Sequence, residues 1–255
     1  MIVILYLAVT LVVGYLIGNI NFARIFSWIF AKKDITTIGS KNPGTMNMLR
    51  TQGFGEALLT LTFEAIKSGG PAIGSYFLFE YFFPGFGNLA YFLTGFGAII
   101  GHCYPVFYKF KGGKGVACTF GMFVFHPALW WMALVIFAIC FALFFFVQYA
   151  FIISLTFILT MSIYATCMFA INSTMWFIPI IVILWINFAL IVWLHRGNIK
   201  RFAAGVENKV DLKEKIFKKK SKASQVAVQT NVEAGAETQQ TAETKEEKND
   251  KTTTD

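Results

Sequence analysis

A glycine- and lysine-rich stretch at residues 101–115 is the part of this 255-residue chain most suited to chemistry. Three lysines and three glycines fall within its last seven residues, Lys109 to Gly115. Lysine is costly in hydrocarbon, so these side chains should lie at a membrane boundary. Glycines let a backbone approach a ligand and turn N–H groups toward it, and a cation just before a helix suits a phosphate. The stretch predicts a phosphate cradle at the lipid–water interface; the alternative is a basic loop that only fixes topology.

The composition is that of an all-α polytopic membrane protein. Hydrophobic residues make up 56% of the chain and charged residues 14%, and the mean hydropathy is +0.59. From Val116 to Leu194 there is no Asp, Glu, Lys or Arg, which at about 20 residues per crossing holds three helices and part of a fourth. We expect a seven-transmembrane-helix bundle, with five as the fallback count. The helices are expected over residues 1–30, 56–83, 89–108, 115–126, 127–148, 151–170 and 175–194.

Charge patterning predicts two regions and an orientation. Residues 1–207 should form the membrane domain, and 208–255 a basic, then low-complexity, disordered tail. The loops after the first, third and seventh helices carry nearly all the Lys and Arg outside the tail, whereas the opposite connections carry none. We therefore expect a multi-pass plasma-membrane protein with its N-terminus outside and its basic loops and tail in the cytoplasm. The net charge of +8 reports this orientation and not nucleic-acid binding.

The first basic loop, residues 31–55, offers groups that could hold a phosphorylated polyol. Arginine binds a phosphate through two N–H groups, and Ser and Asn side chains can orient hydroxyls. The alternative is an ordinary turn around Pro43. The candidate residues are Ser40, Asn42, Gly44, Asn47 and Arg50.

The third basic loop begins at His195 and contains Asn198, Arg201 and Glu207. If it is helical, His195 and Asn198 share a face one turn apart, which would direct both at one site. The alternative is an interfacial histidine satisfied by its neighbours.

Several reaction types are excluded by missing patterns. Lys114 is followed by Gly115 and not by Ser or Thr, so the second loop is not a P-loop. The chain has no Asp five residues after a His, which the common acyl-CoA acyltransferases need, and no G-x-S-x-G elbow. No group of His and carboxylates predicts a metal. The site is rich in anion binders and poor in bases, which suits substrates that bring negative charge and a good leaving group.

Together the three loops resemble those of the bacterial acyl-phosphate:glycerol-3-phosphate acyltransferases, the PlsY family, over about residues 10 to 209. The matching residues are Gly39-Ser40-x-Asn42-Pro43-Gly44-x-x-Asn47-x-x-Arg50, then Gly101-His102-x-x-Pro105-x-x-x-x-Phe110-Lys111-Gly112-Gly113-Lys114-Gly115, then His195-x-x-Asn198-Ile199-x-Arg201 with Gly205 and Glu207. Two segments depart from the family's pattern. Its usual Ser-Ile-Pro is Asn19-Ile20-Asn21 here, and its Asp-x-x-Lys-Gly is Glu64-Ala65-Ile66-Lys67-Ser68.

The resemblance implies a seven-helix bundle with a cytoplasmic active site that transfers an acyl group from acyl phosphate to the first hydroxyl of glycerol 3-phosphate, giving lysophosphatidic acid and phosphate. No cofactor is expected, because acyl phosphate is a mixed anhydride. The implied catalytic residues are Ser40, Arg50, Lys114, His195 and Asn198, and the implied substrate- and phosphate-binding residues are Asn42, Gly44, Asn47, His102, Lys111, Gly112, Gly113, Gly115, Arg201 and Glu207.

Within that set, Gly112 to Gly115 would hold the acyl-phosphate phosphate and steady its leaving charge. Ser40, Arg50 and Lys111 would hold glycerol 3-phosphate, and the third loop would orient the attacking hydroxyl. The expected partners are acyl phosphate, glycerol 3-phosphate, membrane lipids and, as a candidate, the enzyme that produces acyl phosphate. The rival hypothesis is a transporter of an organic phosphate such as glycerol 3-phosphate, which would use similar loops.

Overall fold

The computed structural model describes residues 2–172 and 175–212, which are helical and contain no strand. The described part belongs to one compact unit that runs to Leu212. The predicted disordered tail lies outside the described residues from 213 onward, so its disorder stays a prediction. The elements are α1 (Ile2–Gly18), α2 (Phe22–Ala31), α3 (Thr45–Thr51), α4 (Phe54–Phe82), α5 (Gly87–Cys103), the 3-10 turn η1 (Val106–Tyr108), α6 (Val116–Val124), α7 (Trp130–Val147), α8 (Ala150–Ile171), α9 (Phe177–Leu194) and α10 (Arg196–Ala203).

Five segments among the described residues are long and apolar enough to cross a membrane. They are Ile2–Ala31, Gly87–Tyr108, Trp130–Val147, Ala150–Ile171 and Phe177–Leu194. The predicted count of seven is therefore not confirmed, and the fallback of five fits. Two predicted crossings are absent from this set for physical reasons: α4 carries Glu56, Glu64, Lys67 and Glu80, and α6 has only 9 residues.

The prediction of a single helix over residues 1–30 is wrong, because the helix is interrupted between Gly18 and Phe22. Asparagine side chains compete for backbone groups and favour caps over helix interiors. Asn21 caps α2 by accepting a hydrogen bond from Arg24 N at 2.9 Å. Asn19 accepts one from Val106 N at 2.6 Å. The break thus ties α1 to the segment that follows α5.

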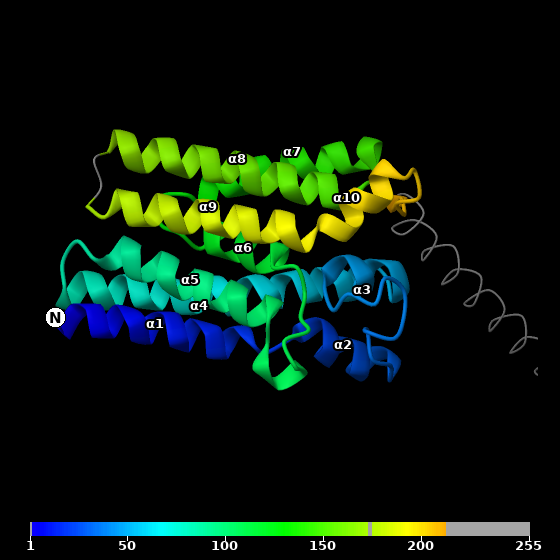
Figure 1. Cartoon of the computed structure of the whole chain (residues 1–255), viewed down its shortest axis with the longest axis horizontal. Coiled ribbons are helices and arrows are strands. Elements are labelled where there is room, and N and C mark those ends of the chain that lie inside the picture. The colour runs from blue at the N-terminus through cyan, green and yellow to red at the C-terminus, as the bar shows by residue number, and fades with distance from the viewer. Residues whose placement is uncertain (1, 173–174, 213–255) are drawn as a thin grey trace, which may run out of the picture. The chain divides into compact units, whose positions relative to one another are not determined.

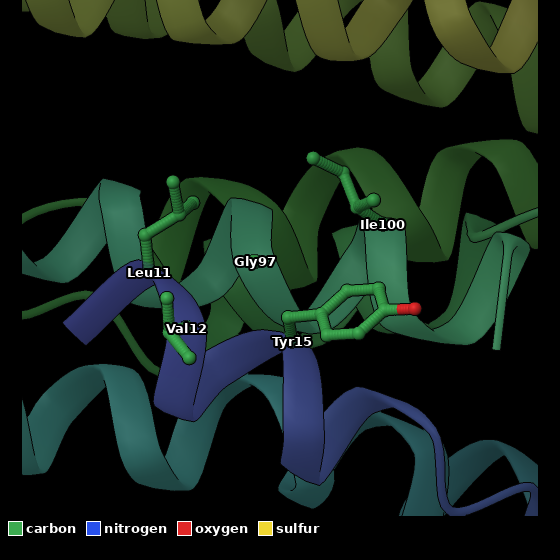
Figure 2. Close-up of a pocket in the computed structure, with 5 residues that line it drawn as sticks. All are labelled: Leu11, Val12, Tyr15, Gly97 and Ile100. Atoms are coloured by element: carbon green, nitrogen blue, oxygen red, sulfur yellow. The ribbon is translucent and has the colours of Figure 1, made fainter. Parts of the chain in front are cut away.

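Helices α1 and α5 approach each other closely through paired glycines. Gly14 and Gly18 lie against the backbone of α5, and Gly97 and Gly101 lie against the backbone of α1. A Cβ atom at any of the four would collide with the facing helix. Such four-residue spacing of small residues lets membrane helices pack without side chains between them. A small apolar hollow of about 220 Å³ lies beside this contact, lined by Leu11, Val12, Tyr15, Gly97 and Ile100 (Figure 2).

The long helices form two groups joined by α6. Helices α1, α4 and α5 pack together, and α7 packs on α8, which packs on α9. The short α6 contacts both groups and lies between them in Figure 1. Its Gly121 meets the α4 backbone at Ala65, again with no room for a Cβ atom.

The three polar loops gather at one end of the bundle. Figure 1 shows α3 and α10 at the end opposite the start of α1, and the chain enters α6 from that same end. The first loop, predicted as irregular, contains the short helix α3. The third loop contains α10, so the condition under which His195 and Asn198 were expected to share a face, a helical loop, is met.

Candidate active site

Contacts among the three polar loops bring the predicted site residues together. The first and second loops meet at Pro43 and Gly113, where a Cβ atom added to Gly113 would lie 3.0 Å from the Pro43 carbonyl oxygen. The second and third loops meet where Lys114 Nζ donates a hydrogen bond to Asn198 Oδ1. Arg50 reaches from α3 to the segment after α10 and donates to Asn208 O at 3.4 Å.

Asn47 organises the first loop from beneath. It is 1% exposed, and its Oδ1 accepts from Ser40 N at 2.8 Å. Its Nδ2 donates to Ile35 O and Ile38 O, each at 3.0 Å. Both Nδ2 hydrogen bonds of Asn47 are thus made within the first loop. Ser40 is exposed at the surface of that loop. Asn47 is therefore a scaffold residue, and its predicted direct role in phosphate binding is not retained.

The paired glycines of the second loop serve a different purpose from the one predicted. Gly112 N donates to Cys103 O at 3.1 Å, and Gly113 N donates to His102 O at 3.1 Å. These bonds satisfy carbonyls at the C-terminal end of α5, which have no partner within the helix. A Cβ atom at either glycine would collide with the end of α5. The glycines thus let the loop approach the helix end, and their N–H groups do not point at a phosphate.

The part of the second loop whose geometry is suited to an anion is the start of α6. Gly115 caps this helix with φ +81°, a conformation that favours glycine. The first N–H groups of a helix lack intrahelical partners and carry partial positive charge. Lys114 directly precedes them. Burial and the nearby cations of Arg201 and Arg50 lower the pKa of Lys114 to about 8, although Glu207 opposes this.

His195 stands at the junction of α9 and α10 as a neutral acceptor. It is 3% exposed, and its Nδ1 lies 2.8 Å from the Ile191 carbonyl oxygen. A carbonyl can only accept, so Nδ1 carries the proton and Nε2 is the acceptor. Burial and the charge of Lys114 lower the pKa of His195 to about 4. The imidazole is therefore uncharged at neutral pH.

Glu207 holds the polar face of α10 in place. Its Oε1 accepts from Asn198 Nδ2 at 2.7 Å and its Oε2 accepts from Arg201 Nε at 2.7 Å. The first bond orients Asn198 so that its Oδ1 faces Lys114. A carboxylate bonded in this way supports the site but repels a phosphate. The predicted direct phosphate-binding role of Glu207 is therefore not retained.

The remaining predicted residues fall at different depths. Lys111 is exposed in the turn after η1, and Asn42 is half-buried. Gly44 caps α3 by accepting from Asn47 N at 3.0 Å. His102 is 4% exposed and lies under the second loop, which separates it from the site surface. Its ring belongs to the framework, and its predicted contact with substrate is not retained.

The two segments that depart from the family's pattern are in contact with each other. Glu64 Oε1 accepts from Phe22 N at 2.8 Å, and Lys67 Nζ donates to Ile20 O at 2.6 Å. Glu64 and Lys67 were not among the residues predicted for the site from the sequence. A signal was available, because Glu64 and Lys67 lie three apart on one helix face in the middle of α4, and ionisable residues inside a membrane protein often mark a functional region.

Comparisons with known proteins point to one family. Residues 8–205 match the family model described as glycerol-3-phosphate acyltransferase. The glycerol-3-phosphate acyltransferase of Mycoplasmopsis synoviae is 35% identical over 223 residues, which cover 79% of this chain and 93% of the relative. That of Shouchella clausii is 35% identical over 214 residues, with 82% and 98% covered.

Two solved structures also resemble the chain. One is the crystal structure of PlsY (YgiH), an integral membrane glycerol 3-phosphate acyltransferase, in its glycerol 3-phosphate form. It has a TM-score of 0.68 and 26% identity, and the match covers 83% of this chain and 99% of that chain. The lysophosphatidic acid form of the same protein has a TM-score of 0.65 and 26% identity, with 81% and 97% covered.

Proposed function

The chain belongs to the glycerol-3-phosphate acyltransferase family of membrane enzymes, and we propose that it uses acyl phosphate as the acyl donor. The first hydroxyl oxygen of glycerol 3-phosphate attacks the acyl carbonyl carbon. The bond from that carbon to the phosphate oxygen breaks, and the phosphate leaves with the electron pair. The hydroxyl proton passes to a substrate phosphate, so the products are lysophosphatidic acid and inorganic phosphate.

The observation that carries the proposal is the cationic cluster where the three loops meet. Arg50, Lys114 and Arg201 are close enough for their charges to affect one another, and Lys114 precedes the positive end of α6. The cluster holds more positive than negative charge even with Glu207 in it. It would bind the phosphate groups of both substrates and stabilise the charge that develops on the leaving phosphate.

His195 and Asn198 would orient the attacking hydroxyl. The neutral imidazole offers Nε2 as a hydrogen-bond acceptor, but a pKa of about 4 makes it a weak base. The protein would therefore act mainly by bringing two charged reactants together in the right geometry. The side chain of Ser40, exposed at the surface of the first loop, would form a hydrogen bond to glycerol 3-phosphate through its hydroxyl group.

The membrane arrangement follows from the position of the loops. We infer that the end of the bundle that carries them faces the cytoplasm, because basic loops are retained on that side. The acyl chain would lie along apolar helix surfaces open to the bilayer. The rival, a transporter of an organic phosphate, requires polar groups along a path through the bilayer, whereas the cationic cluster is confined to one end.

The test supplies purified protein with acyl phosphate or acyl-CoA, together with glycerol 3-phosphate, and identifies the lipid formed. We expect lysophosphatidic acid from acyl phosphate only. Lys114→Ala should lower kcat/KM by about 100-fold to 1,000-fold. The matched control is Lys33→Ala, which removes an exposed lysine from the first loop and should change nothing. Counterflow of glycerol 3-phosphate in liposomes without acylated product would favour the transporter instead.

A further inference from the structure

A buried polar cluster lies beneath the loops and has no part in the reaction scheme above. It consists of Glu64 and Lys67 on α4, His102 at the end of α5 and Cys118 on α6. The side chains of Glu64 and Lys67 are each 1% exposed and in direct contact. His102 Nδ1 lies 3.0 Å from Glu64 Oε2 and 3.1 Å from Lys67 Nζ. Buried charges are costly even when paired, so stability alone is a poor explanation for them.

A metal site is the first alternative to consider. The potential ligand atoms of Glu64, His102 and Cys118 lie within 4.8 Å of one another. However, the Lys67 ammonium contacts both Glu64 and His102. Its positive charge would repel a metal cation from the same carboxylate. The cluster is therefore an ion network.

One arm of the network holds the break between α1 and α2. Glu64 Oε1 accepts from Phe22 N, the first residue of α2, at 2.8 Å. A carboxylate at this position satisfies an unpaired N–H group and the positive end of the helix. Lys67 Nζ donates to Ile20 O, within the break, at 2.6 Å. These two bonds fix the chain on both sides of Asn21.

Asn21 carries this constraint to the first loop. Its Nδ2 donates to Pro43 O at 3.2 Å, and the residue is 1% exposed. The second arm runs through His102, whose carbonyl oxygen accepts from Gly113 N at 3.1 Å. The His102 ring also packs against Gly113, whose other neighbour is Pro43 O. The two arms therefore meet at the junction of the first and second loops, one residue before Lys114.

From this geometry we propose that Glu64 and Lys67 are positioning residues that hold the first loop and the Gly113–Lys114 segment in register for acyl transfer. They touch no substrate and act through Asn21 and His102. The inference rests on the proposed function, because register matters only if both loops hold reactants. Loss of the network would leave the binding groups in the protein but displace them relative to one another.

The experiment compares Lys67→Met, the double variant Glu64→Gln/Lys67→Met and the control Ser75→Ala in purified protein. Lys67→Met removes the ammonium from Glu64, which keeps its contact with His102 within the ion network, whereas the double variant makes both positions on α4 uncharged without restoring the bond to Ile20 O. Ser75→Ala removes another buried polar contact between α4 and α5, the bond of 3.0 Å to Thr94, which has no tie to the loops. Thermal stability, kcat and both KM values are measured for each.

We expect kcat to fall about tenfold to 100-fold in Lys67→Met, because a displacement of about 1 Å in a bound reactant can cost that much. The double variant should recover thermal stability relative to Lys67→Met while its kcat stays low, and Ser75→Ala should keep the wild-type kcat. If kcat instead follows thermal stability across the variants, or stays at the wild-type value, the network is merely structural and the proposal is overturned. The double variant decides the question if Lys67→Met does not fold. Failure of the proposed function is distinguishable, because wild-type protein would then form no lysophosphatidic acid in the same assay.

Discussion

The lowered pKa of Lys114 predicts that activity falls on the alkaline side of neutral pH. In the proposed mechanism the ammonium form of Lys114 binds a substrate phosphate, so the enzyme should lose activity as this lysine loses its proton. Burial, Arg201 and Arg50 bring its pKa to about 8, whereas an ordinary lysine titrates near 10.4. The substrate phosphates ionise near pH 6, so their titration affects the acid side of the profile and not this one.

The size of the effect follows from the pKa. A group with a pKa of about 8 is protonated in about 91% of molecules at pH 7 and in about 9% at pH 9, so kcat/KM should fall about tenfold. The quantity to measure is kcat/KM for acyl phosphate, because it reports ionisation in the free enzyme. Bound phosphate stabilises the ammonium, so the corresponding fall in kcat should occur at higher pH.

Substitutions at Lys114 and at the charged residues near it test whether the alkaline fall in kcat/KM is due to Lys114. Lys114→Arg should remove the alkaline fall, because an arginine side chain keeps its proton throughout the range. Arg201→Gln removes a nearby cation and should move the fall to higher pH, whereas Glu207→Gln removes a nearby anion and should move it lower. Lys33→Arg is the control, since Lys33 is exposed and should leave the profile unchanged.

The assay follows release of inorganic phosphate between about pH 6 and pH 10, with the spontaneous hydrolysis of acyl phosphate subtracted at each pH. The reasoning is refuted if wild-type kcat/KM stays flat to about pH 9.5, or if Lys114→Arg retains the fall near pH 8. Shifts of Arg201→Gln and Glu207→Gln in the same direction would also contradict it.

Three further predictions concern residues around the cationic cluster. Glu207→Gln should misorient Asn198 and so lower kcat about tenfold at pH 7 in a steady-state assay. An unchanged kcat would show that Glu207 does not support the site. Gly113→Ala should displace the second loop from His102 and abolish measurable acyl transfer, whereas wild-type turnover would show that the loop has room for a methyl group. Ser40→Ala should raise the KM for glycerol 3-phosphate about tenfold with no loss of thermal stability, because only the backbone of Ser40 is bonded to Asn47; a rise in the KM for acyl phosphate alone would reassign it.

Much of the architecture was predictable because it depends on local composition. The charge-free block from Val116 to Leu194 indicated membrane helices, and three of the candidate spans lie within it. The grouping of lysine and arginine in three loops indicated that these loops share one end of the bundle, and the contact between Lys114 and Asn198 agrees. The number of crossings was less predictable, because α4 mixes charged and apolar residues and α6 is short.

Predictions from the sequence were wrong where a residue type can either bind a ligand or form hydrogen bonds within the fold. Gly112 and Gly113 were interpreted as N–H donors for a phosphate, whereas the structure uses their N–H groups to cap α5. Asn47 and His102 were interpreted as ligand contacts, but both are buried in the framework under the loops. Residue type specifies which bonds a group can make, and only the surrounding fold decides which partner it meets.

By itself, then, the sequence determined that this is a helical membrane protein with three basic, polar loops, because hydropathy and charge act residue by residue along the chain. The tertiary structure alone decided how those loops are held. Lys67 bonds to Ile20 across 47 positions, and Lys114 to Asn198 across 84. Such contacts arise from the packing of helices distant in the chain, so no local pattern of residues encodes them.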